Sequence, residues 1–390
     1  MLILKTAFKN ILGGGKRTWL NVAVLSITFV IMVGYNGILD GWVEESRYET
    51  KNWETGAGHI WHPEYDRYDM YTLQDAHEQI PKSFETHIRS RSMTPILVLQ
   101  ASIYPQGRFQ NIVLKGIDTD QDILHIPSYQ LKHAGDEIPV IIGRRMAKSA
   151  DLKEGDRVML RWRDKNGVFD AREILVVNVF DTKVTSADVG QIWMDLKDLY
   201  TMTGMDGEAT YLVNSDKSSI TSDTDGWKYK DLKFLMSDIE IMEKSSRVQS
   251  YVTYIILLAI ALLAVFDTQT LSIFRRQREI GTYVALGMTP KRVTRLFTLE
   301  GTSYSILAIL AGAVWGTPVL YWFAQVGMKT PDAYGDAGMM VGNALYPVYK
   351  VSAILVSIIV IVVLSALISY LPARKIARQN VVLALKGKIN

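Results

Sequence analysis

The chain has 390 residues, of which 48% are apolar and 21% charged, and it contains no cysteine. This composition excludes a disordered chain, disulfide frameworks, cysteine-type zinc sites and thiol catalysis. The net charge is only +3, yet residues 1–18, 274–298 and 371–390 together carry +14, so the rest of the chain carries −11. Such polarity is typical of a protein with a membrane between its basic and acidic parts, and it does not indicate nucleic-acid binding.

The chain begins with a basic segment, residues 1–18, which is predicted to be a cytoplasmic amphipathic helix. Apolar pairs recur at helical spacing across residues 2–12, with Lys5 and Lys9 outside that stripe. A helix of this kind can lie on the inner leaflet of a membrane. The uncharged run that follows is too long for a signal-peptide core, and no cleavage site succeeds it, so residues 19–41 are predicted to stay as a first transmembrane helix.

Three more apolar stretches are long enough to cross a bilayer, which takes about 20 apolar residues. They predict transmembrane helices at residues 250–274, 299–326 and 351–371, with an elbow at 275–298, an extracytoplasmic loop at 327–350 and a cytoplasmic tail at 372–390. The alternative for each run is a buried core helix. The positive-inside rule places all three basic pieces on one side, so both termini are predicted to be cytoplasmic.

Residues 42–249 separate the first two transmembrane helices and hold 26 basic against 34 acidic residues. We expect a folded extracytoplasmic domain of the α/β or α+β class. Short β-rich runs and a hairpin signal at 165–167 predict strands at 59–61, 96–103, 111–117, 140–142, 157–163, 173–180, 191–194 and 210–213. From residue 231 the pattern becomes helical and is predicted to run without interruption into the second transmembrane helix.

The elbow at residues 275–298 contains sequence signals for where helices end and begin. One helix is predicted to run out of the second transmembrane helix to about Leu286, where Gly287 is a left-handed C-cap. A second helix is predicted to begin with Thr289 as N-cap and Pro290 at its first position. An exposed apolar set is expected between the basic flanks: Ile280, Tyr283, Val284 and Leu286. One interpretation is a basic loop that obeys the positive-inside rule. The other is a docking element for a cytoplasmic partner, because a simple loop would not need this order.

Three strings resemble the FtsX-like permease family, which includes lipoprotein-releasing permeases and MacB-type exporters. They are REIG at 278–281, ALGMT at 285–289 and EG at 300–301. The sequence LPARKIAR at 371–378 is similar to the family's C-terminal ending, with Asn380 where the family usually has proline. Residues 58–60, 140–143 and 152–156 resemble segments of its periplasmic domain, so the resemblance covers the whole chain.

The resemblance implies a non-enzymatic permease subunit of an ABC transporter in the bacterial inner membrane, working by mechanotransmission. A separate cytoplasmic ATPase subunit would bind ATP and Mg²⁺, so this chain is expected to hold no cofactor and no catalytic residue. A second permease subunit, identical or not, would complete the transporter. The resemblance assigns ATPase coupling to Arg278, Glu279, Ile280, Gly281, Tyr283, Leu286, Gly287 and Arg292. It also implies a MacB-like periplasmic core domain with two subdomains, at about 43–115 plus 196–245 and at 116–195.

The leading functional hypothesis is extraction of lipoproteins from the outer leaflet of the inner membrane. Charged residues interrupt the apolar runs only at Asp40 and Asp267, too few to line a path for a hydrophilic solute. A lipid-facing cleft is predicted at Phe29, Val33, Ile38, Val252, Ile255 and Ile256. Two alternatives stay open: an exporter that works with a periplasmic adaptor, and an FtsX-like signal transmitter that activates a cell-wall hydrolase.

Several other motifs were weighed. The glycine run before Lys16 lacks the spacing of a phosphate-binding loop, and His59-x-x-His62 is too small a constellation for a metal site. Asp267 is predicted to pair across a subunit interface; the alternative, near the inner end of its helix, is snorkelling or pairing with a basic neighbour. Two glycine pairs permit close helix packing, within one subunit or between two: Gly37 with Gly41, and Gly312 with Gly316.

Overall fold

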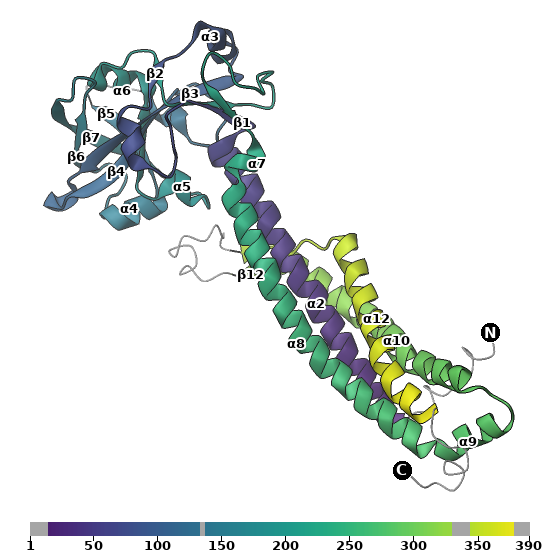
Figure 1. Cartoon of the computed structure of the whole chain (residues 1–390). Coiled ribbons are helices and arrows are strands. Elements are labelled where there is room, and N and C mark those ends of the chain that lie inside the picture. The colour runs from purple at the N-terminus through teal and green to yellow at the C-terminus, as the bar shows by residue number, and fades with distance from the viewer. Residues whose placement is uncertain (1–14, 133–136, 330–343, 378–390) are drawn as a thin grey trace. The chain divides into compact units, whose positions relative to one another are not determined.

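The computed structural model describes residues 15–132, 137–329 and 344–377, with the side chains of 15–18 and 376–377 left aside. The predicted amphipathic helix at 2–12 and most of the tail lie outside these residues. Two compact units are present: a helical bundle built from residues 15–42, 242–329 and 344–377, and a β-rich domain built from the described residues of 43–241 (Figure 1).

Four long helices contribute to the bundle: α2 (Gly15–Thr50), α8 (Ser237–Arg275), α10 (Pro290–Val326) and α12 (Val351–Ala377). Each is long and apolar enough to cross a membrane. The predicted fold class is confirmed: four apolar helices, with a β-rich domain between the first and the second. Buried side chains from all four form one core, which includes Leu25, Val265, Ala308 and Ile361.

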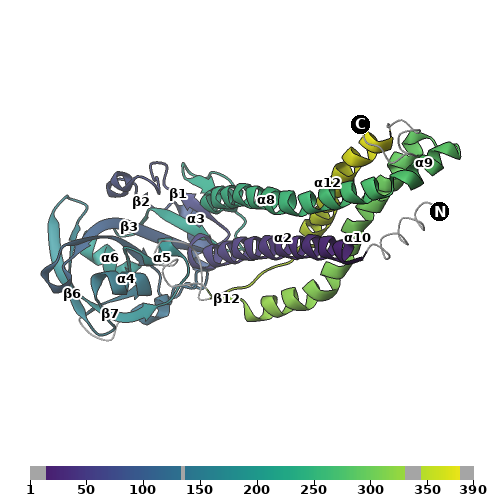
Figure 2. The same cartoon turned by 90° about the horizontal axis from the view of Figure 1, so that it is seen from below.

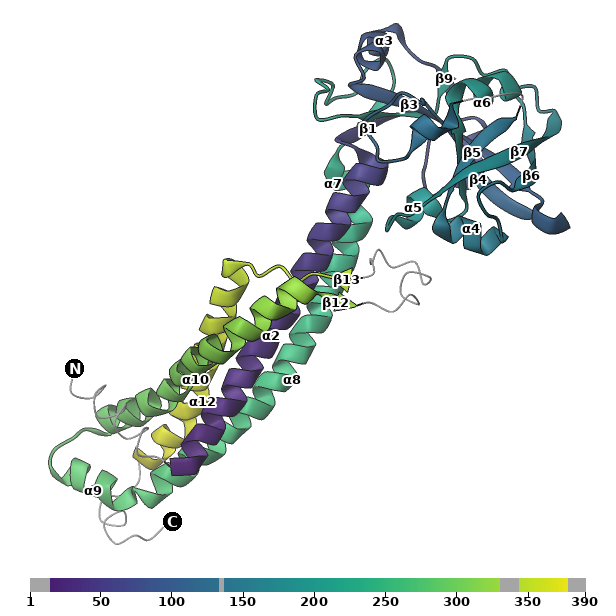
Figure 3. The same ribbon diagram turned by 180° about the vertical axis from the view of Figure 1, so that it is seen from behind.

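Short elements connect the long helices. The elbow helix α9 (Gln277–Ala285) lies at the end of the bundle where α8 ends and α10 begins (Figure 2). Between α10 and α12 the strands β12 (Met328–Lys329) and β13 (Ala344–Leu345) pair antiparallel (Figure 3). The prediction of one helix from α8 to Leu286 is wrong, because the backbone leaves the helical path at Arg276. This turn directs α9 back onto the bundle.

Glycines set two close approaches inside the bundle. A Cβ atom on Gly312 or Gly316 of α10 would lie 3.0 Å from Phe29 or 2.4 Å from Val30 of α2, so this pair packs two helices of one chain together. The atoms nearest to Gly41 of α2 belong to the segment before α12, and a Cβ there would lie 2.1 Å from the backbone oxygen of Tyr346. The neighbouring hydrogen bond from Val348 N to Gly37 O is 2.8 Å long.

The β-rich domain has a nine-stranded sheet in the order β11-β1-β10-β3-β4-β8-β5-β7-β6. Its strands are β1 (Gly58–Trp61), β3 (Met93–Ile103), β4 (Gln110–Ile117), β5 (Ile138–Gly143), β6 (Arg157–Arg163), β7 (Phe169–Phe180), β8 (Gln191–Asp195), β10 (Tyr211–Asn214) and β11 (Lys228–Lys230). The pairs β4–β8 and β5–β7 are parallel. Because β3 also pairs with β6, six strands close on themselves around an apolar core.

Shorter elements surround this sheet. The strands β2 (Glu78–Gln79) and β9 (Glu208–Ala209) form a separate pair. The helical segments are η1 (Lys51–Thr55), η2 (Met70–Gln74), α3 (Lys82–Arg89), η3 (Pro105–Gly107), η4 (Ser128–Leu131), α4 (Arg144–Ala150), α5 (Thr185–Asp188), α6 (Leu196–Thr203) and α7 (Leu232–Leu235). A second core outside the closed strands includes Trp61, Trp193 and Tyr211.

All eight predicted strands are confirmed at or near their expected bounds. The sequence missed short strands such as β2, β9 and β11, which are two or three residues long and have little apolar pattern to read. The predicted subdomain boundary at 115–116 falls within β4, whose partners β3 and β8 belong to one continuous sheet.

Gly41→Ala is expected to destabilise the bundle by about 1–3 kcal/mol, because the added methyl group meets a backbone oxygen that no side-chain rotation can move. Gly34→Ala is the matched control on the same helix, since its methyl group would lie 3.3 Å from a flexible leucine side chain. Thermal unfolding of both variants in detergent checks this. Equal stabilities would contradict the close approach at Gly41.

Candidate functional site

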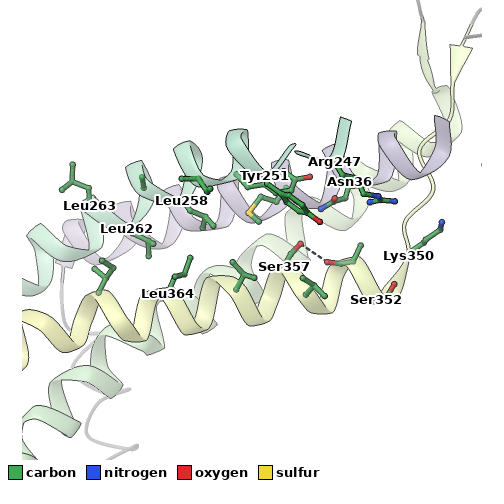
Figure 4. Close-up of a pocket in the computed structure, with 18 of the residues that line it drawn as sticks. Asn36, Arg247, Tyr251, Leu258, Leu262, Leu263, Lys350, Ser352, Ser357 and Leu364 are labelled. Atoms are coloured by element: carbon green, nitrogen blue, oxygen red, sulfur yellow. Dashed lines mark hydrogen bonds between the residues drawn. The ribbon is translucent and has the colours of Figure 1, made fainter. Parts of the chain in front are cut away.

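The bundle contains an apolar groove of about 1050 Å³ between α2, α8 and α12 (Figure 4). One wall is the face of α8 that carries Leu258 and Leu262, and the other is the face of α12 that carries Val356 and Leu364. Both helices are uncharged along this stretch because the sequence runs 251–266 and 351–371 contain no charged residue. The groove is therefore a long hydrocarbon-like surface of the kind that accommodates acyl chains.

One end of the groove is charged. Asp40 of α2 is only 2% exposed, and Arg247 Nη2 of α8 donates to its Oδ1 at 2.8 Å. The same nitrogen lies 2.8 Å from Glu243 Oε1, and Lys350 Nζ, directly before α12, lies 3.9 Å from Asp40 Oδ1. A buried carboxylate is tolerated only when it is paired, and removal of its partner typically costs about 3–5 kcal/mol. This cluster joins three segments of the chain and places Asp40, Arg247 and Lys350 at the groove mouth.

The predicted cleft residues are distributed over three environments. Ile255 lines the groove. Phe29 and Val33 are buried in the helix core, and Ile38 is half-buried. Val252 and Ile256 are exposed on α8 outside the groove lining. Sequence reasoning missed the α12 wall, because hydropathy identifies a transmembrane helix without indicating which of its faces meets α8. Lys350, a cation directly before that helix, was the available signal.

The elbow is held against the bundle by an arginine. Arg276 Nε donates to Glu279 at 2.8 Å and its Nη1 lies 3.1 Å from the buried Glu300 of α10. The guanidinium also lies 5.2 Å from the ring centre of Phe297. Beneath it, Ile280 is 3% exposed and packs with Ile273 and Val293. These contacts make the elbow a packed element of the bundle rather than a loose loop.

The remaining coupling residues lie on the elbow as follows. Arg278, Glu279, Leu286, Gly287 and Arg292 are exposed, Tyr283 is half-buried, and Gly281 and Ile280 are buried. The expected exposure of Ile280 is therefore wrong, because Ile280 anchors the elbow. Leu286, with 81% of its surface exposed, is the prominent apolar side chain.

The predicted helix end and helix start in the elbow are largely confirmed. Gly287 has φ +92°, a left-handed conformation that other residues adopt only with strain. Pro290 begins α10. Thr289 occupies the N-cap position with extended backbone, but its side chain makes no capping hydrogen bond, contrary to the expectation.

Three further polar residues noted in the sequence lie outside the groove lining and the elbow: Asp267, His59 and His62. Asp267 is exposed on α8, and its pairing across a subunit interface stays a prediction. His59 accepts a hydrogen bond from Trp61 Nε1 at 3.1 Å and stacks on Tyr211, and burial lowers its pKa to about 3. His62 is also buried. Among the described residues, no cluster of three or more potential ligands could hold a metal ion.

Comparison with known proteins assigns the C-terminal part of the bundle. Residues 251–381 match the family model described as FtsX-like permease C-terminal. This segment is therefore similar to the C-terminal domain of FtsX-like permeases. The matched segment includes most of α8, the elbow, α10 and α12, so it supplies two walls of the groove and the whole elbow, whereas Asp40 lies outside it. The resemblance inferred from the sequence is confirmed for residues 251–381.

Two further similarities accompany this match. The ABC transporter permease YtrF of Bacillus subtilis (strain 168) is 26% identical over 132 residues, which are 33% of this chain and 30% of YtrF. The match thus spans less than a third of that relative. The extracellular domain of the ABC-type transporter YknZ from Gram-positive bacteria aligns with 13% identity and a TM-score of 0.26, over 42% of this chain and 84% of that structure.

Ile280→Ala is expected to destabilise the elbow by about 2–5 kcal/mol, because it removes a buried anchor. Leu286→Ala, at an exposed site directly after α9, is expected to change stability by less than about 0.5 kcal/mol. Hydrogen exchange of the backbone amides of α9 measures the difference. Equal protection in both variants would show that the elbow does not depend on the Ile280 contact.

Proposed function

We propose that this chain is the permease subunit of an ABC transporter that extracts lipoproteins, or amphiphiles of that kind, from the outer leaflet of the bacterial inner membrane. The observation that carries the proposal is the groove between α8 and α12, which combines an apolar length with a charged mouth. Its volume of about 1050 Å³ and its open side suit acyl chains, and its mouth suits a polar head group.

The charged mouth favours an amphiphile with an anionic or zwitterionic head. Asp40 is already engaged by Arg247, whereas the Lys350 side chain is 47% exposed and lies at the longer distance of 3.9 Å. Lys350 can therefore turn to a ligand without leaving Asp40 unpaired. A hydrophilic solute would find no comparable path, because the groove walls along α8 and α12 are uncharged beyond this cluster.

The orientation in the proposal follows from charge. The elbow and the residues after α12 carry the basic clusters, so they face the cytoplasm, and the β-rich domain with the groove mouth faces the periplasm. A lipid head group would then reach Lys350 from the outer leaflet. The similarity to YtrF, an ABC transporter permease, supports the transporter class over an FtsX-like signal transmitter.

A separate ATPase subunit would dock on the elbow. The exposed Leu286 offers an apolar anchor between the exposed cations Arg278 and Arg292, which suits a groove with an acidic rim. The ion pairs of Arg276 fasten the elbow to α10, so displacement of the elbow by the ATPase would displace α10 as well. Helices α2 and α8 continue without interruption from residues of the bundle into residues of the β-rich domain, which supplies the mechanical connection. A second permease subunit completes the proposed assembly.

Leu286→Asp is expected to abolish co-purification of the ATPase subunit, because it places a carboxylate at the apolar anchor without disturbing a buried contact. Leu286→Met, which keeps the apolar surface, is the control and should retain the ATPase. Tandem affinity purification from the native host measures both. Recovery of equal amounts of ATPase with the two variants would contradict docking at Leu286, and absence of any ATPase from the wild-type complex would overturn the transporter proposal.

Val356→Trp is expected to reduce lipoprotein release from proteoliposomes about tenfold, because the indole fills the groove. Val252→Trp is the matched control: Val252 is similarly exposed, 54% against 60%, but lies outside the groove lining. Release is measured with a triacylated lipoprotein, the partner ATPase and ATP. Equal release by the two variants would exclude the groove as the lipid path.

A further inference from the structure

The β-rich domain contains a second cavity, of about 470 Å³, which is separate from the groove and the elbow. Its floor is the outer face of β3, β4 and β8. The strand register pairs Val98 with Lys115 and Lys115 with Trp193, and in the next row Val113 with Gln191. Directly paired residues point to the same face of a sheet, so all five side chains share this face. The walls come from η1, η2, α5 and the segment around α7.

Lys115 is the unusual residue of this floor. Its side chain lines the cavity, yet the residue is only 8% exposed. Its Nζ lies 4.8 Å from the ring centre of Trp193, and in the described ranges no hydrogen bond or ion pair involves this ammonium. Burial lowers the pKa of Lys115 to about 8, while the nearby Glu54 opposes that shift, so the amine is still mostly protonated at neutral pH. A buried ammonium without a hydrogen-bond acceptor is costly to the fold.

A second polar group faces the same cavity without a partner. Gln191 also lines the cavity, and its buried Oε1 accepts no hydrogen bond from any described residue. The other charged side chains of the lining are already engaged. Ser186 Oγ donates to Glu54 Oε2, and Arg67 donates to Asp238 and to Leu235 O. Asp66 and Asp69 accept hydrogen bonds from backbone N–H groups of their own loop. In the described part of the chain, two polar groups of the cavity therefore remain without a hydrogen-bond partner: the Lys115 ammonium, which is a donor, and Gln191 Oε1, which is an acceptor. The Glu54 carboxylate lies nearby.

The remaining surface of the cavity is apolar. It is formed by Val98, Val113, Met70, Leu73, Val189 and Ile239. A cavity of this size accommodates a molecule of amino-acid to dipeptide dimensions. A ligand that satisfies the polar groups needs a carboxylate for Lys115 and an adjacent N–H donor for Gln191 or Glu54. An apolar side chain on the same molecule would occupy the rest.

We infer that this cavity is a binding site for an α-amino carboxylate with an apolar side chain, held by Lys115 through its carboxylate and by Gln191 through its N–H group. This chemistry has two sources, a free amino acid and the C-terminal residue of a peptide. The site is independent of the transporter proposal, because it involves neither the groove nor the elbow.

The test uses the full-length chain in detergent and isothermal titration calorimetry with three probes. Leucine represents the free amino acid, N-acetyl-leucine the peptide end, and leucinamide lacks the carboxylate. Binding of leucine or of N-acetyl-leucine, with leucinamide at least tenfold weaker, supports the site and identifies the source. Equal binding of leucinamide, or no binding of either carboxylate at millimolar concentration, overturns it, and water then solvates the ammonium.

Two variants link the binding to the cavity. Lys115→Met retains a long side chain without the charge and is expected to weaken binding of the carboxylate probe at least tenfold. Gln191→Leu should also weaken this binding, because it removes the acceptor. Lys153→Met, on the exposed surface of the same domain, is the matched control and should bind as the wild type does. Circular dichroism verifies that each variant folds. Unchanged affinity in both folded cavity variants would contradict the assignment, whatever the outcome of the ATPase experiments.

Discussion

Asp40 connects the apolar helices to the function proposed for them. Its carboxylate is buried at the end of an otherwise uncharged run of α2, where an unpaired charge would cost several kcal/mol. Arg247 of α8 and Lys350 before α12 supply the compensating charges, so the three segments must approach one another at this level. The same cluster closes one end of the apolar groove and gives it a polar mouth. Packing of the segment 346–348 against Gly37 and Gly41 fixes the strand-like approach to α12 beside it.

The elbow likewise depends on one charged side chain, Arg276, which pairs with two carboxylates. Arg276 leaves the helical path of α8 and uses its guanidinium to hold Glu279 and the buried Glu300, while Ile280 fills the core below. Residues that are close in sequence therefore have different roles. Ile280 and Arg276 fasten the elbow to the bundle, whereas Arg278, Leu286 and Arg292 remain exposed to a partner.

In the β-rich domain, closure of six strands sends one face inward and the other outward. The inward face is uniformly apolar, with residues such as Leu97, Leu114 and Ile142. The outward face carries a second apolar core, and within it the cavity above Lys115 and Gln191. Strand alternation thus places a lysine and a glutamine on an interior surface, where each lacks a described hydrogen-bond partner. Neither residue attracts notice in the sequence, because a lysine between two apolar strand residues is usually solvent-exposed.

The sequence alone determined the four apolar helices, the large domain between the first two, most of the strands and the elbow punctuation at Gly287 and Pro290. These features depend on local composition and on spacing along the chain, which hydropathy, periodicity and backbone preference report directly. Only the tertiary structure showed which face of α8 lies toward α12 and that the backbone oxygen of Tyr346 packs against Gly41. It also showed that Ile280 is buried and that Lys115 and Gln191 line the same cavity. Each of these depends on contacts between residues far apart in the chain, and the energy of such contacts leaves no periodic pattern in the sequence.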